Sequence, residues 1–290
     1  MATDGKSYLG ICYADNHLFY AVHLPEQGND IQRIGSIDFN FDIDAALSTG
    51  APSEVEVLKK SIQDLKAEFS AGSIQMLYPA EHECWTVVPR AVYEDSSERE
   101  THIGILMHGS ERSNIEISWH QLANTDNKLL LLRDTTVTPG LSALSNELGN
   151  IQFPSDFEIA QEWQVHTKNK SAFLMVHCQN HIITVTSSIM GNLRGCTWFE
   201  YEDPEDLPYL WNLYAAHTPW MNGIHDKIFV FGLYAKSAAE QLTTYWSHHG
   251  DLVFPDSLSA THVQAEEETY GFPLESAYPA IILSLQHEVL

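Results

Sequence analysis

Apolar and polar residues alternate along the opening of the chain, the pattern of strands that bury one face. Alternate residues at 9–13 fall on one side, and Asp15-Asn16 is a turn signal before a second strand at 18–22. A third strand is predicted at 31–41. Three consecutive strands joined by short connections predict an antiparallel meander.

The period changes to that of a helix near residue 52. Ser53 and Glu56 have the spacing of a capping box, and apolar residues then recur at helical spacing as far as Phe69. We therefore predict a helix with Ser53 as its N-cap. The rest of the first half is predicted to contain strands at 74–78, 85–92, 115–122 and 129–134 and helices at 98–108, 139–148 and 156–163.

The opening pattern returns in the second half, after a polar segment at 165–171 that we take as the junction between two lobes. The predicted elements here are strands at 173–178, 181–187, 193–201, 228–231 and 252–254 and helices at 207–217, 237–248 and 279–287. The dipeptides Asn16-His17 and Asn180-His181 fall at the same place in the two meanders, which suggests a duplication. The sequence thus predicts an α/β protein of two lobes, residues 1–165 and 166–290.

Composition narrows the range of partners. The 290 residues carry a net charge of -24, which should repel nucleic acid and anionic lipid and favour a basic partner. No apolar run reaches the roughly 18 residues of a membrane helix, and no basic leader with an apolar core is present. The four cysteines are scattered, as is typical of reduced thiols. We expect a cytoplasmic protein that neither binds nucleic acid nor inserts directly into a membrane.

The layout of a meander, a helix, a strand and a helix, repeated in a second lobe, resembles the actin-like, ribonuclease-H-like superfamily. Within it, the chain looks most similar to the PilM family of type IV pilus assembly proteins and the cytoplasmic part of the secretion protein GspL. The segment at about 110–163 resembles a small subdomain inserted in the first lobe of pilus-assembly members. The resemblance covers nearly the whole chain and implies a duplicated fold, each lobe with a mixed five-stranded sheet flanked by helices.

Members of this superfamily bind nucleotide through an acidic, glycine-containing turn in each lobe. In the first lobe, Gly10 resembles the approach to this turn, but Cys12 stands where the Asp is expected. Ala14 replaces the Gly of the turn, and Phe19 falls where a Lys is expected. Asp15 is the nearest carboxylate. A Cys is a poor substitute at this position, because Mg²⁺ prefers oxygen ligands.

The second lobe departs from the family pattern in the same way. His177 occupies the Asp position and Gln179 the Gly position, and Gly232-Leu233 keeps one Gly of the pair that would lie against adenosine. We therefore expect weak binding of ATP and Mg²⁺ or none, and no other cofactor. The resemblance then implies a non-catalytic scaffold in pilus or secretion-system assembly. Such a scaffold would dock a protein or peptide partner, such as the cytoplasmic tail of a membrane protein, and a homodimer is also compatible with it.

An ATP-dependent enzyme of the same superfamily, an ATPase or kinase, is the main alternative. It would need a carboxylate to position Mg²⁺, and Asp15 and Asp226 are the candidates.

An acidic cluster lies at 202–206, beside two prolines. It could meet a basic peptide, although exposed charged loops of this kind are more commonly only solvated.

A zinc protein is the remaining hypothesis. Cys178 and His181 flank a two-residue turn and could hold Zn²⁺ if Cys12 and His17 supplied further ligands. Adjacent strand residues face opposite ways, so His177 could not easily serve together with Cys178. Polar residues flanking a turn and a half-buried thiol are the commoner interpretation, so we predict no resident metal.

Overall fold

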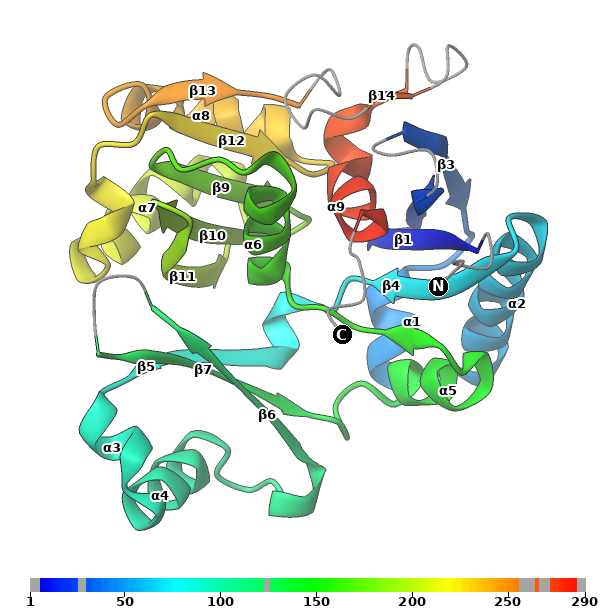
Figure 1. The fold of residues 1–290 in the computed structure, drawn as a ribbon, viewed down its shortest axis with the longest axis horizontal. Coiled ribbons are helices and arrows are strands. Elements are labelled where there is room, and N and C mark those ends of the chain that lie inside the picture. The colour runs from blue at the N-terminus through cyan, green and yellow to red at the C-terminus, as the bar shows by residue number, and fades with distance from the viewer. Residues whose placement is uncertain (1–5, 26–29, 123–125, 256–263, 266–271, 286–290) are drawn as a thin grey trace.

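The computed structural model describes residues 6–25, 30–122, 126–255, 264–265 and 272–285. It has two α/β lobes side by side and a third, smaller sheet, which lies below the second lobe in the view of Figure 1. Each lobe begins with an antiparallel three-stranded meander, whose first strand then pairs in parallel with a later strand. The predicted repetition of the layout is therefore confirmed.

The sheet of the first lobe has the strand order β14-β3-β2-β1-β4-β8. Its strands are β1 (Ser7–Ala14), β2 (His17–His23), β3 (Asp30–Asp38), β4 (Ala71–Met76), β8 (Ile151–Gln152) and β14 (Gln264–Ala265). The pairing of β1 with β2 begins at Ala14 and His17, which confirms the tight turn between them. The two-residue β14 comes from the C-terminal part of the chain and adds to the edge of the five strands of the lobe itself.

Three helices pack against one face of this sheet, namely α1 (Ile43–Thr49), α2 (Pro52–Glu68) and α5 (Pro139–Leu148). Leu9, Ile11 and Tyr13 of β1 are buried against them, as the alternation predicted. Because the side chains of a strand alternate between its faces, the residues between them point to the opposite face. That opposite face is the one that turns toward the second lobe.

The first two helices begin differently from the prediction. We did not predict α1, although Asp42 caps it by accepting a hydrogen bond from the third following N–H at 2.8 Å and Gly50 ends it in the left-handed region. The N-cap of α2 is Ala51, so the prediction of a Ser53 cap was wrong. A proline in the first turn of α2 supplies the preset φ that favours a helix start.

The second lobe has a five-stranded sheet in the order β11-β10-β9-β12-β13. Its strands are β9 (Phe173–Cys178), β10 (Ile182–Ile189), β11 (Asn192–Glu200), β12 (Lys227–Phe231) and β13 (Asp251–Val253). Helices α7 (Leu207–His217) and α8 (Ala235–Trp246) cover one face with a core that includes three fully buried aromatic residues, Phe199, Trp211 and Trp246. Helix α6 (Asp156–Thr167) packs on the other face and extends beyond the predicted end at residue 163.

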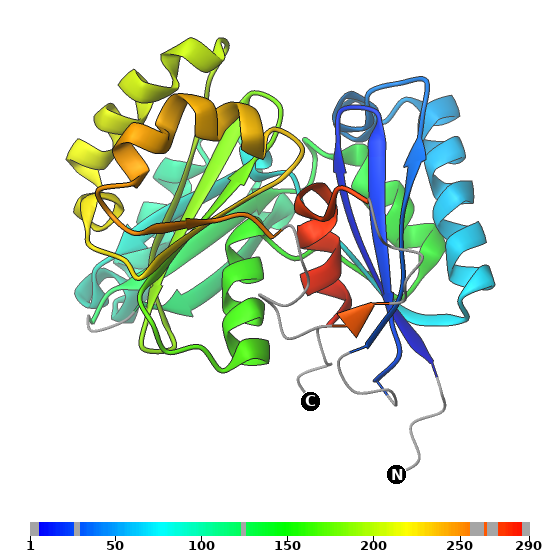
Figure 2. The ribbon, with the colours of Figure 1, turned by 90° about the horizontal axis from the view of Figure 1, so that it is seen from above.

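Helix α9 (Leu274–Ser284) lies between the two lobes, as Figure 2 shows. It begins five residues before the predicted start at Pro279, and the predicted end at His287 lies outside the described residues. Its buried residues join one continuous core with Phe19 and Ile34 of the first lobe and with Trp163 of α6. The C-terminal helix therefore fills the space between the lobes with packed apolar side chains.

The third sheet has the order β5-β7-β6, from β5 (Glu83–Val88), β6 (Ile115–Gln121) and β7 (Lys128–Asp134). The short helices α3 (Arg90–Glu94) and α4 (Ser96–Leu106) complete it with a small core of its own. The sequence suggested an insertion at about 110–163, but β5 precedes that range and the third sheet ends at Asp134. We propose instead that the insertion covers residues 83–134. The lobe boundary at 165/166 stays a proposal, and α6 runs across it.

Candidate functional site between the lobes

The turns that open the two meanders face a common pocket of about 660 Å³ between the lobes. The first lobe contributes Asp15 from the β1–β2 turn, and the second lobe contributes Asn180 and His181 from the β9–β10 turn. This is where the resemblance places nucleotide phosphates. Six positions were named from the sequence. Asp15 is part of the described lining of this pocket, and the other five are not.

Gly10 and Cys12 face α9. A Cβ atom at Gly10 would lie 2.0 Å from the Ala280 carbonyl oxygen, so glycine lets the strand and the helix approach closely. The thiol of Cys12 is 2% exposed and donates a weak hydrogen bond to the Ser276 carbonyl oxygen at 3.6 Å. Burial raises the pKa of Cys12 to about 12, so the thiol is neutral near pH 7. Both residues therefore serve the packing between the lobes.

Asp15 links the lobes directly. The Tyr234 hydroxyl, from the second lobe, donates a hydrogen bond to Asp15 Oδ2 at 2.5 Å. The backbone of Asp15 is in the left-handed region at φ 53°, and its carbonyl oxygen accepts a hydrogen bond from the Ile43 N–H at the start of α1. The other carboxylate oxygen, Oδ1, is buried without a hydrogen-bond partner.

The second-lobe positions gather around a carboxylate that the sequence analysis did not single out. Asp156, in the first turn of α6, is 4% exposed and accepts hydrogen bonds from His177 Nδ1 at 2.9 Å and from Gln179 Nε2 at 3.4 Å. The Thr184 hydroxyl donates to the same oxygen. The capping box of Ser155 with Glu158 was the local signal that could have placed Asp156 at this helix start.

Gly232 has a structural requirement for glycine. Its φ is 103°, and a Cβ atom there would lie 2.4 Å from the carbonyl oxygen of Cys178. Its N–H donates to the carbonyl oxygen of Glu275 at 2.7 Å, which ties β12 to the start of α9. Glycine at this position thus allows β9, β12 and the start of α9 to pack closely together.

The alternative magnesium ligand Asp226 does not belong to this region. It lies immediately before β12, which runs parallel to β9, whereas His177 pairs with the far end of β12 at Phe231. Its carboxylate accepts a hydrogen bond from the Ala172 N–H at 2.9 Å. Because the two ends of the sheet are separated by the length of the strand, the prediction that Asp226 lies near the cleft was wrong.

The zinc hypothesis is also contradicted by the positions of its ligands. Cys178 is fully buried in the core beneath α7 and α8, and burial raises the pKa of its thiol well above the ordinary value. Cys12 faces α9, and His17 pairs with Asp38 at 2.8 Å. Among the residues that the structure describes, no three His, Cys, Asp or Glu side chains are placed to hold a metal ion.

Negative charge dominates the pocket. The first lobe contributes Asp15, Asp42, Asp44 and Glu81, and the second contributes Glu200, Glu202 and Asp206. His181 is the one basic residue among the described residues of the lining. Two of the four second-lobe acids that the sequence analysis singled out at 202–206 are thus part of this pocket.

These carboxyl groups also affect the pKa values of one another. Burial raises the pKa of Asp44 well above its ordinary value, and the nearby charge of Glu81 raises it further. The pKa of Glu81 is raised mainly by burial as well. A tri- or tetra-anionic nucleotide would add charge of the same sign, and the described lining holds no Lys or Arg to offset it. The described lining therefore offers no cationic side chain to the phosphates of ATP, and in this respect it does not fit a nucleotide.

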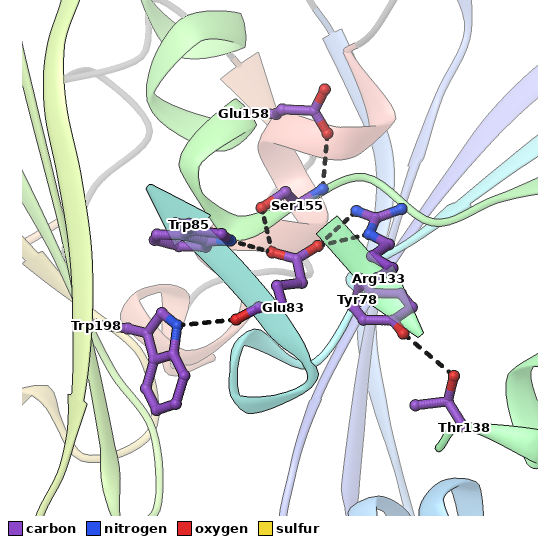
Figure 3. Close-up of polar contacts among 8 residues, drawn as sticks. All are labelled: Tyr78, Glu83, Trp85, Arg133, Thr138, Ser155, Glu158 and Trp198. Carbon is purple, nitrogen blue, oxygen red and sulfur yellow. Dashed lines mark hydrogen bonds and ion pairs between the residues drawn. The ribbon is translucent and has the colours of Figure 1, made fainter. Parts of the chain in front are cut away.

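A second polar cluster lies where both lobes and the small sheet meet (Figure 3). Glu83, at the start of β5, has a fully buried side chain. One of its carboxylate oxygens accepts a hydrogen bond from Arg133 Nε at 2.7 Å and forms an ion pair with Nη2 of the same guanidinium at 2.6 Å. The other oxygen accepts from Trp85 Nε1 at 2.6 Å and from the Ser155 hydroxyl at 2.5 Å. Burial raises the pKa of Glu83 to about 7, while Arg133 and the hydrogen bonds act in the opposite direction.

This cluster joins the three parts of the molecule. The Trp198 indole, from β11 of the second lobe, donates to the Glu83 carbonyl oxygen at 3.2 Å. Arg133 lies over the ring of Tyr78, which follows β4 of the first lobe, at 4.2 Å from the ring centroid. Tyr78 in turn shares a buried hydrogen bond of 3.2 Å with Thr138. We interpret the Glu83 cluster as the joint that sets the position of the small sheet.

Comparison with known proteins identifies the fold. The chain matches no protein-family model, and no curated protein is similar enough in sequence to count as a match. A chain of the PilM–PilN type IV pilus biogenesis complex matches with a TM-score of 0.65 at 11% identity, over 96% of this chain and 97% of that one. A Bacteroides thetaiotaomicron protein described as having an actin-like ATPase fold and unknown function matches with a TM-score of 0.51 at 14% identity, over 86% of this chain and 91% of that one.

These likenesses show that the protein has the actin-like ATPase fold, so the predicted fold class is confirmed. The likeness to the PilM–PilN complex chain extends over nearly the whole length of both chains. The cytoplasmic domain of EpsL, from the type II secretion system of Vibrio cholerae, also matches, with a TM-score of 0.48 at 11% identity over 77% of this chain and 81% of that one. Among the described residues, no helix combines the length and the apolar character needed to cross a bilayer.

Proposed function

We propose that this protein is a non-catalytic, actin-like scaffold that docks a segment of a protein partner. The observation that carries the proposal is the charge of the pocket between the lobes. Seven carboxylates and one histidine line it where an actin-like ATPase would hold nucleotide phosphates. Charge of this sign opposes an anionic ligand and favours a cationic one.

The remaining positions of the cleft support the same proposal. Gly10 and Cys12 pack against α9, and Asp15 is bonded to Tyr234 across the lobes. A cleft joined in this way resists the opening and closing of two lobes around a nucleotide. The pocket between the lobes is then available to a protein partner, whose binding requires no hydrolysis of nucleotide.

We extend the proposal to the assembly of a pilus or a secretion system, with the tail of a membrane protein as the partner and the cytoplasmic side of the membrane as the location. The likeness to a chain of the PilM–PilN type IV pilus biogenesis complex supports this context. A second copy of the chain is the other partner that the resemblance suggests.

Nucleotide content and turnover test the proposal. Protein purified without added nucleotide, then denatured and analysed by chromatography, should release none. ATP hydrolysis should stay at the level of a buffer control. Stoichiometric bound nucleotide would contradict the proposal. Hydrolysis that is lost on Asp15→Asn would establish an ATP-dependent enzyme, because Asp15 is the described carboxylate on the β1–β2 turn that lines the pocket.

A further inference from the structure

The two walls of the pocket between the lobes differ in character. The first-lobe wall consists of four acids, carried by the β1–β2 turn, the start of α1 and the 3-10 turn Ala80–His82. The second-lobe wall combines acids with apolar and aromatic surface from Ile182, Tyr201, Tyr209 and Leu210. The Tyr209 side chain is 68% exposed, so its ring forms an open edge of the pocket.

Buried carboxylate oxygens in the first-lobe wall lack hydrogen-bond donors. Asp15 Oδ1 and Glu81 Oε2 are both buried without a partner. Asp44 lines the same wall, is half-buried, and makes no hydrogen bond or ion pair with any other described residue. Removing a carboxylate oxygen from water without a donor or counter-charge destabilises the ionised form. The raised pKa values of Asp44 and Glu81 express the same deficit.

The size and lining of the pocket indicate which kind of cation could pair with these carboxylates. A volume of about 660 Å³ is in the range of ligand pockets and is far larger than a single ion. No described group of side chains is arranged to hold a metal. An Arg or Lys side chain presents an apolar stem and a cationic head with several N–H donors. The stem would contact the aromatic second-lobe wall, and the head would reach the first-lobe acids.

We propose that the pocket between the lobes receives a basic peptide segment, in which an Arg or Lys side chain pairs with Asp44 and Glu81 and adjacent apolar residues contact Tyr209 and Leu210. The inference rests on the proposed function and assigns the chemistry of the docked partner. Glu202 and Asp206 at the second-lobe side extend the negative field that would attract such a segment.

The test uses a labelled peptide of alternating arginine and leucine, with the full-length chain, and follows fluorescence anisotropy. The pocket variant is Asp44→Asn with Glu81→Gln. The matched control is Asp64→Asn with Glu68→Gln, which removes the same charge from the exposed face of α2. The pocket variant should weaken binding by at least roughly tenfold, and the control should change it less than about twofold. Tyr209→Ala offers a second pocket variant on an exposed side chain, and it should also weaken binding.

The folding of the pocket variant is itself informative. Because it removes charges that lack partners, the variant should unfold at the same temperature as the original chain or higher. Equal losses in the pocket and control variants would mean that net charge alone attracts the peptide, and this would overturn the inference. Tighter binding of spermine alone or Ca²⁺ alone than of the peptide would overturn it as well.

Failure of this inference can be distinguished from failure of the proposed function. If the peptide does not bind and the protein neither carries nor hydrolyses nucleotide, the scaffold proposal stands and the basic-segment assignment is wrong. If the protein carries nucleotide or hydrolyses ATP, the proposed function itself is wrong.

Discussion

The buried carboxylate of Glu83 is predicted to hold the small sheet against both lobes, and its removal should be costly. Its side chain has no exposed surface and accepts three hydrogen bonds, one each from Arg133, Trp85 and Ser155, and it is also ion-paired with Arg133. The side chain of Arg133 is only 13% exposed, and it loses its counter-charge in Glu83→Ala. Removing one partner of a buried ion pair typically costs about 3–5 kcal/mol of the free energy of unfolding.

Replacing both partners together separates the loss of the ion pair from general disruption. Replacing both partners, as in Glu83→Leu with Arg133→Met, leaves no uncompensated charge and should cost less than Glu83→Ala alone. The control is Glu94→Ala, which breaks the exposed pair of Glu94 with Arg90 and should change stability by less than about 0.5 kcal/mol.

Urea unfolding above about pH 8, where the Glu83 carboxyl is ionised, measures these differences. Tryptophan fluorescence is a suitable probe because Trp85 and Trp198 both contact Glu83. A Glu83→Ala cost below about 1 kcal/mol, or one equal to that of Glu94→Ala, would refute the role of Glu83 as a joint.

Three further predictions concern packing, the lobe contact and pH. Gly10→Ala should cost at least about 2 kcal/mol in urea unfolding, since its Cβ would meet the Ala280 oxygen at 2.0 Å, whereas Gly104→Ala, with nothing within 4 Å, should be neutral or stabilising. Tyr234→Phe removes the hydrogen bond to Asp15 and should lower stability by about 1 kcal/mol; an unchanged unfolding midpoint would contradict this contact. Folding raises the pKa of Glu83 from 4.5 to about 7, so the folded state binds its proton more tightly than the unfolded state does. The free energy of unfolding should therefore fall by up to roughly 3 kcal/mol as pH rises between these two values. Glu83→Gln should make the unfolding temperature less dependent on pH over the same window.

Local patterns were sufficient for most of the fold. Alternation found the strands of both meanders, and the helix predicted at 207–217 coincides with α7 (Leu207–His217). The predictions were wrong where adjacent residues favour different helix starts, or where an element is too short to show a clear pattern. Ser53 has the spacing of a capping residue, but the proline before it starts the helix earlier. α1 has only seven residues, too few for a clear period, although Asp42 and Gly50 mark its ends.

The site was less predictable because its residues meet only in three dimensions. The sequence led to Asp15 and to part of the cluster at 202–206, but nothing local relates these to Asp44 or Glu81. The roles of Gly10 and Cys12 depend on α9, which is far away in the sequence. The same reason hid the Glu83 joint, whose partners come from strands and helix starts throughout the chain.

Thermal unfolding with and without Mg·ATP at about millimolar concentration tests the central claim, that this cleft is unsuited to nucleotide, most directly. A ligand that binds only the folded state must raise the unfolding temperature. The acidic lining of the pocket predicts no shift beyond that of a matched salt control. A shift that grows with the concentration of Mg·ATP would show that the carboxylate-lined cleft still binds nucleotide, and it would contradict the scaffold proposal.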